Sequence, residues 1–575
     1  MRALQLDVEK IGYRMIKPEA SIYEDVEKKE VKVTNALAIL VSIEKGDTEN
    51  EANELVKETI KFAKQQKLSR IVLYPYAHLS DNLEKPDMAL ELFKYMRENA
   101  AKEFDGEVIY APFGWNKQLS LNIKGHPLAE QSKMYGQKAA EKNLAVVEKK
   151  KRVDLSIVKK SDWSGLPPTD HRTIGEKLDL FSFQEVSPGM VYWHNNGLII
   201  YKELIRYIRE KLDENDYLEI STPALANIAL WYVSGHIDHY KDNMFMMDSD
   251  GEDLGLKPMN CPSTIMIYKS KRWSYKNLPL RLADFDKLYR NEISGALTGL
   301  LRVREITQDD AHIFVAENQL EDELVSLLKL VDEFYKKFEL RYMAKLSTMP
   351  DNHLGSDELW DKAILHLKNA LERNSIKYEI KEKEGAFYGP KIDIDVRDSM
   401  DREWQCATIQ LDYQLPKRFD LTYTGDDGKE YTPVIIHRVI YGSLERFIGV
   451  LTEHVKGKFP TWMSPSQVSI IPISDKSSDY ASMITKKLRE KRIRANFDDS
   501  DKTLDYKIRD AKLHEVPYTI IVGAKEMEKN TISIRDREGK QIQNVELKKF
   551  MEKLKEEIEE RVNGSKIVEQ LLPDK

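Results

Sequence analysis

The strongest constraint on the fold is an alternation of strand-like and helical segments near both ends of the chain. In the first part, apolar runs typical of strands are separated by helical patterns: Ala36–Ile43 (strand), Glu51–Gln65 (helix), Arg70–Pro75 (strand), Met88–Ala101 (helix) and Val108–Ala111 (strand). Strands that alternate with helices in this way form α/β units. We therefore expect residues 1–136 to fold as an α/β domain.

The last part of the chain repeats the alternation on a smaller scale. Its segments are Val468–Ile473 (strand), Tyr480–Lys491 (helix), Arg494–Asn496 (strand), Leu504–Lys512 (helix) and Tyr518–Gly523 (strand), followed by a final strand and helix. This pattern predicts a small βαβ domain with a mixed sheet at residues 461–575.

The middle of the chain divides into a linker and a large core. A chain of 575 residues is long enough for several domains. Residues 137–170 are rich in lysine, with EKKKR at Glu148–Arg152 and SGLPP shortly before Asp170. Such a composition predicts a linker with short helical parts. The remaining residues, 171–460, contain the motifs that carry chemistry.

Composition excludes several classes of protein. No run of eighteen apolar residues is present, so we expect no membrane span. The first residues, MRALQLDVEK, lack the apolar stretch of a signal peptide. The chain has two cysteines, Cys261 and Cys406, which excludes a disulfide framework and favours a reducing cytoplasm. A net charge of −7 argues against a simple basic nucleic-acid binder but leaves room for a local basic face.

Three residues form a candidate zinc site. Cys261 lies in KPMNCP, His312 in QDDAHIF and His437 in VIIHRVIYGSLERF. One thiolate and two imidazoles suit zinc, and three protein ligands leave a fourth position open for a substrate. The spacing is too long for a zinc finger. Taken singly, each residue is better explained as a buried thiol or a hydrogen-bonded core histidine.

The segments around these residues resemble the motifs of class II aminoacyl-tRNA synthetases. LADFDKLYRNE at Leu282–Glu292 and GLLRVREIT at Gly299–Thr307 are similar to motif 2, in which an arginine precedes a glutamate and a glycine-containing loop. GSLERFIGV at Gly442–Val450 is similar to motif 3. An amphipathic helix near Leu198–Leu212, followed by YLEISTPAL with Pro223, has the form of motif 1.

From about Ser164 onward the chain resembles the threonyl-tRNA synthetase family. The segments that carry this resemblance are MNCP, QDDAHIF, FYGPKID, WQCATIQLDY, HRVIYGSLERF and FPTWMSP. The resemblance implies a catalytic core built on an antiparallel sheet, a C-terminal anticodon-binding domain and one zinc ion per chain. It also implies ATP-dependent activation of L-threonine, with Mg²⁺ bound to ATP, and transfer of threonine to tRNA(Thr).

The resemblance also implies which residues bind ATP. Adenylate formation brings two anions together, and guanidinium groups suit it because they stay charged and bind phosphate oxygens bidentately. Arg290 matches the motif 2 arginine at the α-phosphate, and Arg446 matches the motif 3 arginine near the γ-phosphate. Glu292 matches the acceptor from the adenine amino group, and Gln405 is a further ATP-binding candidate. Arg302 is either a second phosphate contact or a surface ion pair.

Threonine recognition is the role that the resemblance gives to the zinc. An apolar pocket separates threonine from valine by only about 10²-fold. A metal with an open position can bind the amino group and the β-hydroxyl together, with Asp310 accepting from the hydroxyl. Gln308, Tyr388 and Gln410 match other threonine-binding positions, and Lys391 matches a catalytic one. Tyr388 and Lys391 are also compatible with ordinary strand-edge residues.

Two further side chains near Lys391 are interpreted from pattern. The alternation in KIDIDV predicts a strand that carries Asp393 and Asp395 on the face opposite its apolar residues. We interpret Cys406 as a structural thiol.

Residues 1–136 resemble the archaeal editing domain of this family, which is related to D-aminoacyl-tRNA deacylases. The segments that carry this resemblance are LYPYAHLS, APFGWNK and KGHPLAE, while LQLDVEK departs from the expected His-Ser-Asp. The resemblance implies hydrolysis of mischarged seryl-tRNA(Thr), with His78, Lys117 and Glu130 in the editing pocket. Alternatively, His78 and His126 are core histidines and Glu130 is a surface acid.

Other functions remain to be weighed. One is a class II synthetase for proline or serine, although the zinc trio speaks against proline. A second is a non-catalytic tRNA-binding or regulatory protein, which would have lost Arg290, Arg446 or a zinc ligand. A third is a stand-alone deacylase, which would have a truncated core.

The motif 1 helix predicts the oligomeric state. Motif 1 forms a two-fold interface in this class, and the apolar residues Ile199, Ile205, Ile208 and Leu212 give the helix one apolar face. We therefore expect a homodimer. A helix that is buried within its own subunit would show the same pattern.

Overall fold

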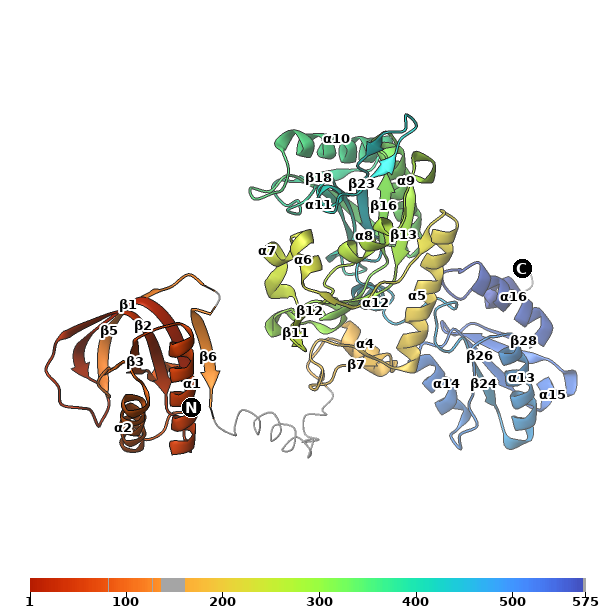
Figure 1. The fold of residues 1–575 in the computed structure, drawn as a ribbon. Helices are drawn as coiled ribbons and strands as arrows, with labels where there is room; N and C mark the ends of the chain where they lie inside the picture. Colours follow the sequence, from red (N-terminus) through yellow and green to blue (C-terminus); the bar gives the residue numbers. More distant parts are fainter. Residues whose placement is uncertain (81, 127, 136–160, 572–575) are drawn as a thin grey trace. The chain divides into compact units, whose positions relative to one another are not determined.

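The computed structural model describes residues 1–80, 82–126, 128–135 and 161–571 (Figure 1). The chain forms two compact units, Met1–Leu155 and Ser156–Lys575. Most of the predicted linker, residues 137–160, lies outside the described residues. Its last ten residues are described, and Trp163 among them packs on Phe181 and Phe183 of the core.

The first unit is a sheet with two helices on one face. Its strands run in the order β4-β3-β2-β1-β5, and β6 also pairs with β1. The elements are β1 (Arg2–Pro18), β2 (Glu30–Ser42), α1 (Glu49–Gln65), β3 (Arg70–Pro75), α2 (Pro86–Glu103), β4 (Glu107–Tyr110), β5 (Trp115–Ile123) and β6 (Glu130–Met134). One apolar core joins both helices to the sheet, and a second core lies on the other face.

Local sequence explains where the two helices begin. Thr48 and Glu51 form a reciprocal capping box that starts α1. Pro86 occupies the first turn of α2, where its missing N–H has no intrahelical partner to lose. In α2, Phe93, Met96 and Ala100 recur at helical spacing and are buried. Both helices are therefore amphipathic and pack their apolar faces on the sheet.

The second unit contains an eight-stranded sheet in its described part, in the order β18-β17-β19-β20-β23-β16-β13-β9. All neighbours in it are antiparallel except β17–β18 and β13–β9. The strands of this sheet are β9 (Leu218–Glu219), β13 (Leu280–Asp284), β16 (Asp310–Val315), β17 (Arg341–Ser347), β18 (Tyr378–Lys381), β19 (Lys391–Arg397), β20 (Glu403–Asp412) and β23 (Val434–Val439).

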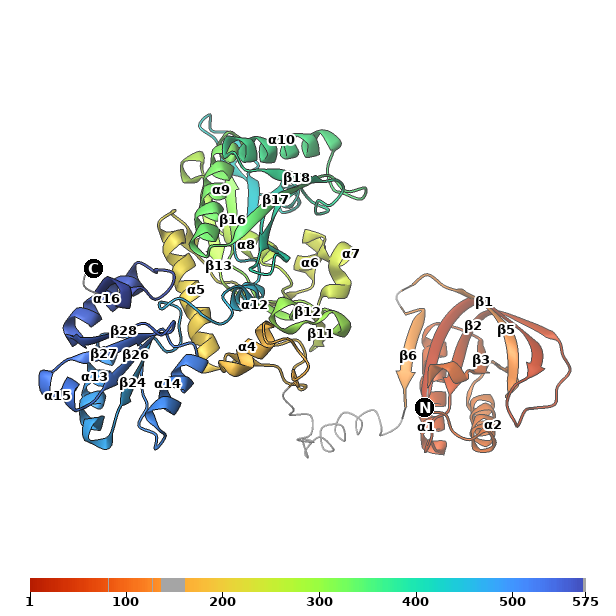
Figure 2. The same ribbon diagram turned by 180° about the vertical axis from the view of Figure 1, so that it is seen from behind.

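Helices cover both faces of this sheet. The main core packs α5, α9, α10 and α12 on one face, and a smaller core packs α8 on the other (Figures 1 and 2). The helices of this region are α4 (His171–Lys177), α5 (Asn195–Asp213), α6 (Ala229–Ser234), α7 (His236–Tyr240), α8 (Cys261–Lys269), α9 (Leu320–Lys337), α10 (Asp357–Arg373), α11 (Leu415–Arg418) and α12 (Leu444–His454). The face that carries α8 is the one that leads to the candidate site.

Short strand pairs surround the large sheet. They are β7 (Phe181–Ser182) with β8 (Tyr192–Trp193), β10 (Leu225–Asn227) with β12 (Glu252–Leu256), β12 with β11 (Met246–Ser249), β14 (Lys287–Tyr289) with β15 (Glu305–Thr307), and β21 (Tyr423–Thr424) with β22 (Glu430–Tyr431). A 3₁₀ turn, η6 (Gly299–Leu301), lies in the motif 2 loop between β14 and β15.

The C-terminal part is a second, five-stranded sheet in the described residues, with the order β25-β24-β26-β27-β28. Its elements are β24 (Val468–Pro472), α13 (Ser478–Glu490), β25 (Ala495–Phe497), α14 (Leu504–Leu513), β26 (Tyr518–Val522), α15 (Ala524–Lys529), β27 (Ile532–Asp536), β28 (Gln541–Val545), α16 (Leu547–Glu559) and α17 (Ile567–Leu571). The first three strands pair in parallel and the last two are antiparallel, so the predicted mixed sheet is confirmed.

The burial of the motif 1 helix contradicts part of the expected subunit interface. Ile208 and Leu212 of α5 are buried in the core of their own unit and cannot offer an apolar face to another subunit. Ile199 and Ile205 are only partly buried. The alternative of a helix buried within its own subunit therefore holds for two of the four residues named for the interface.

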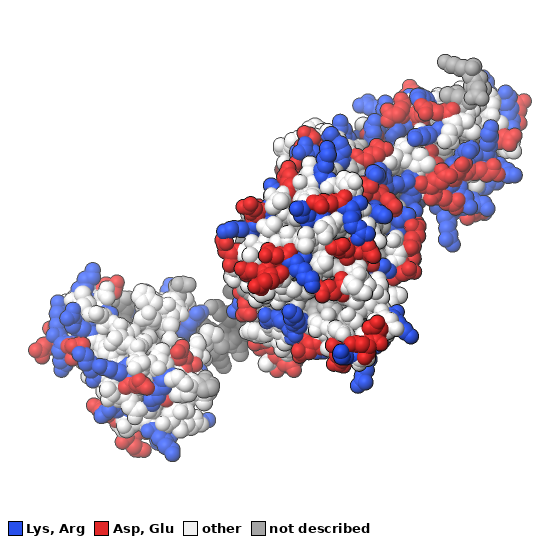
Figure 3. Space-filling model, turned by 90° about the horizontal axis from the view of Figure 1, so that it is seen from above, with Lys and Arg blue, Asp and Glu red and all other residues white. Residues whose placement is uncertain are grey.

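Charges of both signs are mixed on one face of the molecule (Figure 3). On the face drawn in Figure 3, lysines and arginines are interspersed with aspartates and glutamates. Among the described residues, no helix is both long and apolar enough to cross a membrane.

Candidate active site

One row of paired residues crosses the eight-stranded sheet and carries four of the expected site residues. Lys391 pairs with Gln410, Gln410 with His437, and His437 with His312. Directly paired residues on neighbouring strands project to the same face of a sheet. The antiparallel register therefore brings together side chains that are far apart in the sequence.

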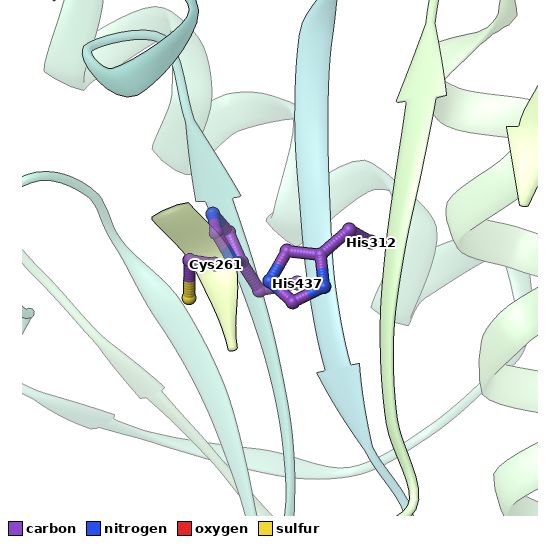
Figure 4. A group of neighbouring side chains, drawn as sticks. All are labelled: Cys261, His312 and His437. Atoms are coloured by element: carbon purple, nitrogen blue, oxygen red, sulfur yellow. The ribbon is translucent and has the colours of Figure 1, made fainter. Parts of the chain in front are cut away.

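The three expected zinc ligands meet at this row. Cys261 begins α8, and its sulfur and the ring nitrogens of His312 and His437 lie within 4.8 Å of one another (Figure 4). Within the described residues, neither ring nitrogen of His312 has a hydrogen-bond partner, and Nδ1 of His437 has none either. Burial lowers the pKa of His312 to about 4, so its imidazole is neutral, which is the form that binds metals. These buried donors fit a zinc ion.

A carboxylate orients one of these ligands. Asp412 is fully buried, and its Oδ2 lies 2.9 Å from Nε2 of His437. Its Oδ1 accepts from the backbone N–H groups of Gln414 at 2.7 Å and Leu415 at 2.9 Å. The carboxylate thus accepts a hydrogen bond from Nε2–H and leaves Nδ1 of His437 free to bind a metal, as carboxylates behind metal-bound histidines commonly do. Sequence reasoning missed Asp412, although it is the second-to-last residue of the quoted segment WQCATIQLDY.

A cavity of about 530 Å³ opens above the trio. Eleven of the expected site residues line it, and they come from the metal, nucleotide and threonine predictions: Cys261, Arg290, Glu292, Arg302, Gln308, Asp310, Tyr388, Gln405, Gln410, His437 and Arg446. His312 is fully buried and does not line the cavity. Lys391 does not line it either, because its Nζ is held 2.6 Å from Asp393.

Three guanidinium groups line the cavity, those of Arg290, Arg302 and Arg446. Arg446, in the first turn of α12, donates from Nε to the backbone oxygen of Leu301 at 2.9 Å. Burial, followed by the nearby charges of Arg290 and Arg302, lowers the pKa of Arg446. Arg302 lies 2.9 Å from Glu292, so the ion pair considered for it is present within the cavity. Three converging cations suit a polyphosphate.

One carboxylate holds two of the expected residues in place. Oδ1 of Asp393 accepts from Nε2 of Gln405 at 2.7 Å and from Oγ1 of Thr408 at 2.9 Å. Its Oδ2 accepts from Lys391. The predicted strand KIDIDV is confirmed as β19, but the roles of Asp393 and Thr408 were missed because they depend on the partner strand β20.

Asp310 lies beside the metal trio. It is two residues before His312 on β16, so both side chains project to the same face. Nδ2 of Asn260 donates to Oδ2 of Asp310 at 3.2 Å, which fixes the carboxylate at the base of the cavity. The ring of Tyr388 lies 5.7 Å from that of His437. Both side chains are therefore within reach of a small ligand that contacts the trio.

The first unit has a cavity of its own, of about 380 Å³. His78 and Lys117 line it. Nζ of Lys117 donates to the backbone oxygen of Pro112 at 2.7 Å and lies 4.9 Å from the ring centre of Tyr74. Burial lowers the pKa of Lys117 to about 8. The expected editing lysine is thus an amine that titrates near neutral pH.

The third expected editing residue does not join this cavity. Glu130 is exposed on β6, where it pairs with Leu6 of β1, whereas Lys117 pairs with Met15 of the same strand. Positions 6 and 15 are separated by about 30 Å along a strand that rises about 3.3 Å per residue. Glu130 and Lys117 of one chain therefore lie apart, and the editing role of Glu130 stays a prediction.

The segment LQLDVEK, which departs from the expected His-Ser-Asp, carries a buried carboxylate. Asp7, in this segment, is buried and lies 3.0 Å from Nε2 of His126 and 2.8 Å from Nζ of Lys124. His126 therefore has a local partner in the first unit, but its side chain is 33% exposed, so it is not a core histidine.

Three protein-family models match the chain, one for each predicted folded part. Residues 1–135 match the archaea-specific editing domain of threonyl-tRNA synthetase. Residues 244–455 match the tRNA synthetase class II core domain (G, H, P, S and T), and residues 467–557 match an anticodon-binding domain. The expected grouping of these three parts in one chain is confirmed.

Curated proteins that are similar in sequence to the chain are named threonine–tRNA ligase. A threonine–tRNA ligase of Natranaerobius thermophilus is 50% identical over 391 residues, which is 68% of this chain and 62% of that protein. One of Clostridium tetani is 49% identical over 393 residues, again 68% and 62%. The chain therefore spans about three fifths of the length of these curated relatives.

A solved structure covers its counterpart almost completely. The crystal structure titled as the RNA-binding domain of threonyl-tRNA synthetase from Cryptosporidium parvum is 40% identical, with a TM-score of 0.66. The match covers 67% of this chain and 98% of that one. Together with the three matched domains and the residues that meet in the large cavity, these similarities show that the chain belongs to the threonyl-tRNA synthetase family.

Proposed function

We propose that the chain activates L-threonine with ATP and transfers it to tRNA(Thr). One observation carries this proposal: Cys261 and His437 of the trio line the same cavity as Arg290 and Arg446, and His312 lies buried beside these two ligands. A three-ligand metal site beside a polycationic site provides both substrates of an amino-acid activation reaction with a place to bind.

In this proposal each group has one task. Cys261, His312 and His437 hold one zinc ion, which supplies an open position for the amino and hydroxyl groups of threonine. Asp310 accepts from that hydroxyl, while Gln308, Tyr388 and Gln410 enclose the amino acid. These residues reject valine because a site built to bind a hydroxyl is left unpaired without it.

The nucleotide side uses fixed positive charge. Arg290 and Arg446 bind the α- and γ-phosphates, with Arg302 as a further contact and Mg²⁺ carried by ATP. Glu292 and Gln405 contact the nucleotide, and Lys391, held by Asp393, acts at the reacting centre. Fixed cations stabilise the charge that develops at phosphorus without reorganisation.

Amino-acid-dependent exchange of pyrophosphate into ATP tests this proposal. We expect strong exchange with threonine, weaker exchange with serine, and little with valine or proline. Arg290→Ala should slow threonine-dependent exchange by about 10²-fold or more. The matched control is Arg373→Ala, because Arg373 is a half-exposed arginine on α10 that pairs with Asp322. Exchange that depends on proline, or none with any amino acid, would contradict the proposal.

A second activity belongs to the first unit. We propose that its cavity hydrolyses seryl-tRNA(Thr), using Lys117 and His78. Zinc cannot reject serine strongly, because serine retains the hydroxyl and the missing methyl changes binding by only about 1–3 kcal/mol. A hydrolytic site is the usual remedy for such limited discrimination.

The partners and location follow from the same proposal. We propose that the chain binds tRNA(Thr), acts in the cytoplasm and forms a homodimer through the motif 1 region. Mass measured in solution at micromolar concentration tests the last point, and a fully active monomer would contradict it.

A further inference from the structure

One buried histidine joins the two segments that carry the phosphate-binding arginines. His171 is fully buried at the start of α4. Its Nδ1 lies 2.7 Å from Oε1 of Glu453, and its backbone N–H donates to the same oxygen at 2.8 Å. Glu453 is in the last turn of α12, whose first turn carries Arg446. Through Nδ1 and its backbone N–H, His171 is therefore bound to α12, the motif 3 helix.

The other ring nitrogen reaches the motif 2 loop. The backbone N–H of Leu300 in η6 donates to Nε2 of His171 at 3.0 Å. Nε2 therefore carries a lone pair, and the ring proton is on Nδ1, where Glu453 accepts it. Leu301, the next residue of η6, accepts through its backbone oxygen from Nε of Arg446 at 2.9 Å. His171 thus holds Leu300, the residue directly before the one that binds Arg446.

The packing around the imidazole of His171 leaves no room for larger side chains at two neighbouring glycines. Gly299 has a φ of 49°, and a Cβ at this position would lie 2.3 Å from Nε2 of His171. A Cβ on Gly449 of α12 would lie 3.1 Å from Cδ2 of Leu301. The glycines allow η6 and α12 to approach the imidazole closely, and α4 and α12 lie side by side in both ribbon views (Figures 1 and 2).

A charged network anchors the carboxylate end. Arg402 pairs with the second oxygen of Glu453 and with Asp398. Glu453 is itself almost fully buried, so its position is set by these partners and not by solvent. The chain of contacts therefore runs from a fixed ion pair through the imidazole to η6 and Arg446.

We propose that His171 is a positioning residue for Arg446 and for the motif 2 loop during ATP binding. It does not line the cavity and lies outside the residues matched by the class II core model, 244–455. This inference rests on the proposed ATP-dependent activation of threonine. A small displacement of a phosphate-binding group far from the chemistry can lower the rate by about 10²-fold.

The test is steady-state pyrophosphate exchange by His171→Phe in the full chain, with ATP and threonine varied separately. Phenylalanine fills the ring volume but makes neither hydrogen bond. We expect the KM for ATP to rise about tenfold, with kcat also reduced, while the KM for threonine and the zinc content stay unchanged. Simple destabilisation lowers the amount of active enzyme and changes neither KM.

His194→Phe is the matched control. His194 also bonds through both ring nitrogens, to Asp179 at 2.6 Å and to Ser182 at 3.0 Å, but these partners belong to neither η6 nor α12. We expect its KM for ATP to equal that of the wild type. If His171→Phe does not fold, His171→Gln, which retains one donor and one acceptor, takes its place and should raise the KM for ATP less.

The outcomes separate the two proposals. A wild-type chain without threonine-dependent exchange contradicts the proposed function. With an active wild type, an unchanged KM for ATP in the folded His171 variant overturns the inference. An equal rise in the KM for ATP and the KM for threonine also overturns the inference. The inference fails as well if His194→Phe raises the KM for ATP as much as His171→Phe does.

Discussion

At the scale of single residues, the orientation of His437 depends on one carboxylate. In Asp412→Asn, the amide oxygen can still accept from the backbone of Gln414 and Leu415, but the amide nitrogen then donates to Nε2 of His437. The ring proton is displaced to Nδ1, which can no longer bind a metal. We expect the affinity for zinc to fall by about 10- to 100-fold, measured by competition with a chelator of known affinity.

The control for this substitution is Asp398→Asn. Asp398 is also buried and accepts from the backbone N–H groups of Met400 and Arg402, but it has no contact with the trio. Absorption of the cobalt-substituted protein reports whether the sulfur of Cys261 still binds the ion. Wild-type zinc affinity in a folded Asp412→Asn variant would show that the carboxylate only starts α11.

Lys117 predicts a pH dependence for the editing site. Burial lowers its pKa to about 8, below the 10.5 of an ordinary lysine, so the ammonium form is present below pH 8 and is lost as the pH rises through 8. If the positive charge holds the substrate or the attacking water, hydrolysis of seryl-tRNA(Thr) by the enzyme should decline through this range. Lys117→Met should lack the activity at every pH.

The measurement is a pH–rate profile of deacylation, with the uncatalysed hydrolysis subtracted at each pH. Lys117→Arg, which keeps its charge, should retain its residual rate above pH 8. A wild-type rate that rises through pH 8 would instead identify the neutral amine as the active form, acting as a general base.

At this scale, the residues that the structure brings together as expected lie inside distinctive segments. The zinc trio and the motif arginines were named because each lies in a segment with a specific pattern, and they line or underlie one cavity. Asp412, Asp393 and Thr408 were missed because their roles depend on which strand lies beside them. The separation of Glu130 from Lys117 was not foreseen for the same reason, since it depends on the register along β1.

At the scale of elements, periodicity located most helices and strands. The predicted strand Arg70–Pro75 coincides with β3, and the predicted helix Glu51–Gln65 is α1 with two more residues at its start. The predicted elements place no strand before Ala36, yet β1 spans Arg2–Pro18. Its register with β5 shifts at Val8/Lys10 and at Met15/Lys17, and these irregularities break the alternation by which a strand is recognised.

The turn before β19 gives a prediction at this scale. A Cβ on Gly389 would lie 1.8 Å from the backbone oxygen of Leu411 in β20, so Gly389→Ala must push the two segments apart. We expect a loss of stability of about 1–3 kcal/mol. The KM for threonine should rise as well, because Tyr388 and the Gly389–Gln410 hydrogen bond move with the turn. Chemical denaturation and pyrophosphate exchange measure the two effects.

Gly165→Ala provides the comparison. A Cβ at this position meets no atom within 4 Å, so we expect the stability and the KM for threonine of the wild type. If Gly389→Ala behaves in the same way, the turn has room that the backbone spacing does not indicate.

At the scale of the whole molecule, composition and motif order predicted three folded parts, and the three matched families agree with them in order and type. The exact boundaries at residues 136, 170 and 460 remain predictions. Each compact unit has its own apolar cores, and among the residues that the structure describes none belongs to cores of both units. The two proposed activities should therefore be separable.

Removing residues 1–136 tests this separation. The truncated chain keeps the zinc trio, the motif arginines and its own core, so charging of tRNA(Thr) with threonine should continue largely unchanged. Seryl-tRNA(Thr) should accumulate, because the zinc accepts both hydroxyl amino acids and discrimination by one methyl group is limited to about 1–3 kcal/mol. Both products are measured on tRNA(Thr) with labelled serine and threonine.

Two comparisons make this prediction specific. Lys117→Met in the full chain should accumulate seryl-tRNA(Thr) in the same way, which attributes the effect to the cavity of the first unit and not to the truncation. Adding residues 1–136 as a separate chain should clear part of the product, though more weakly, because the effective concentration given by the covalent link is lost. If the truncated chain makes no more seryl-tRNA(Thr) than the full chain, the first unit has a different task.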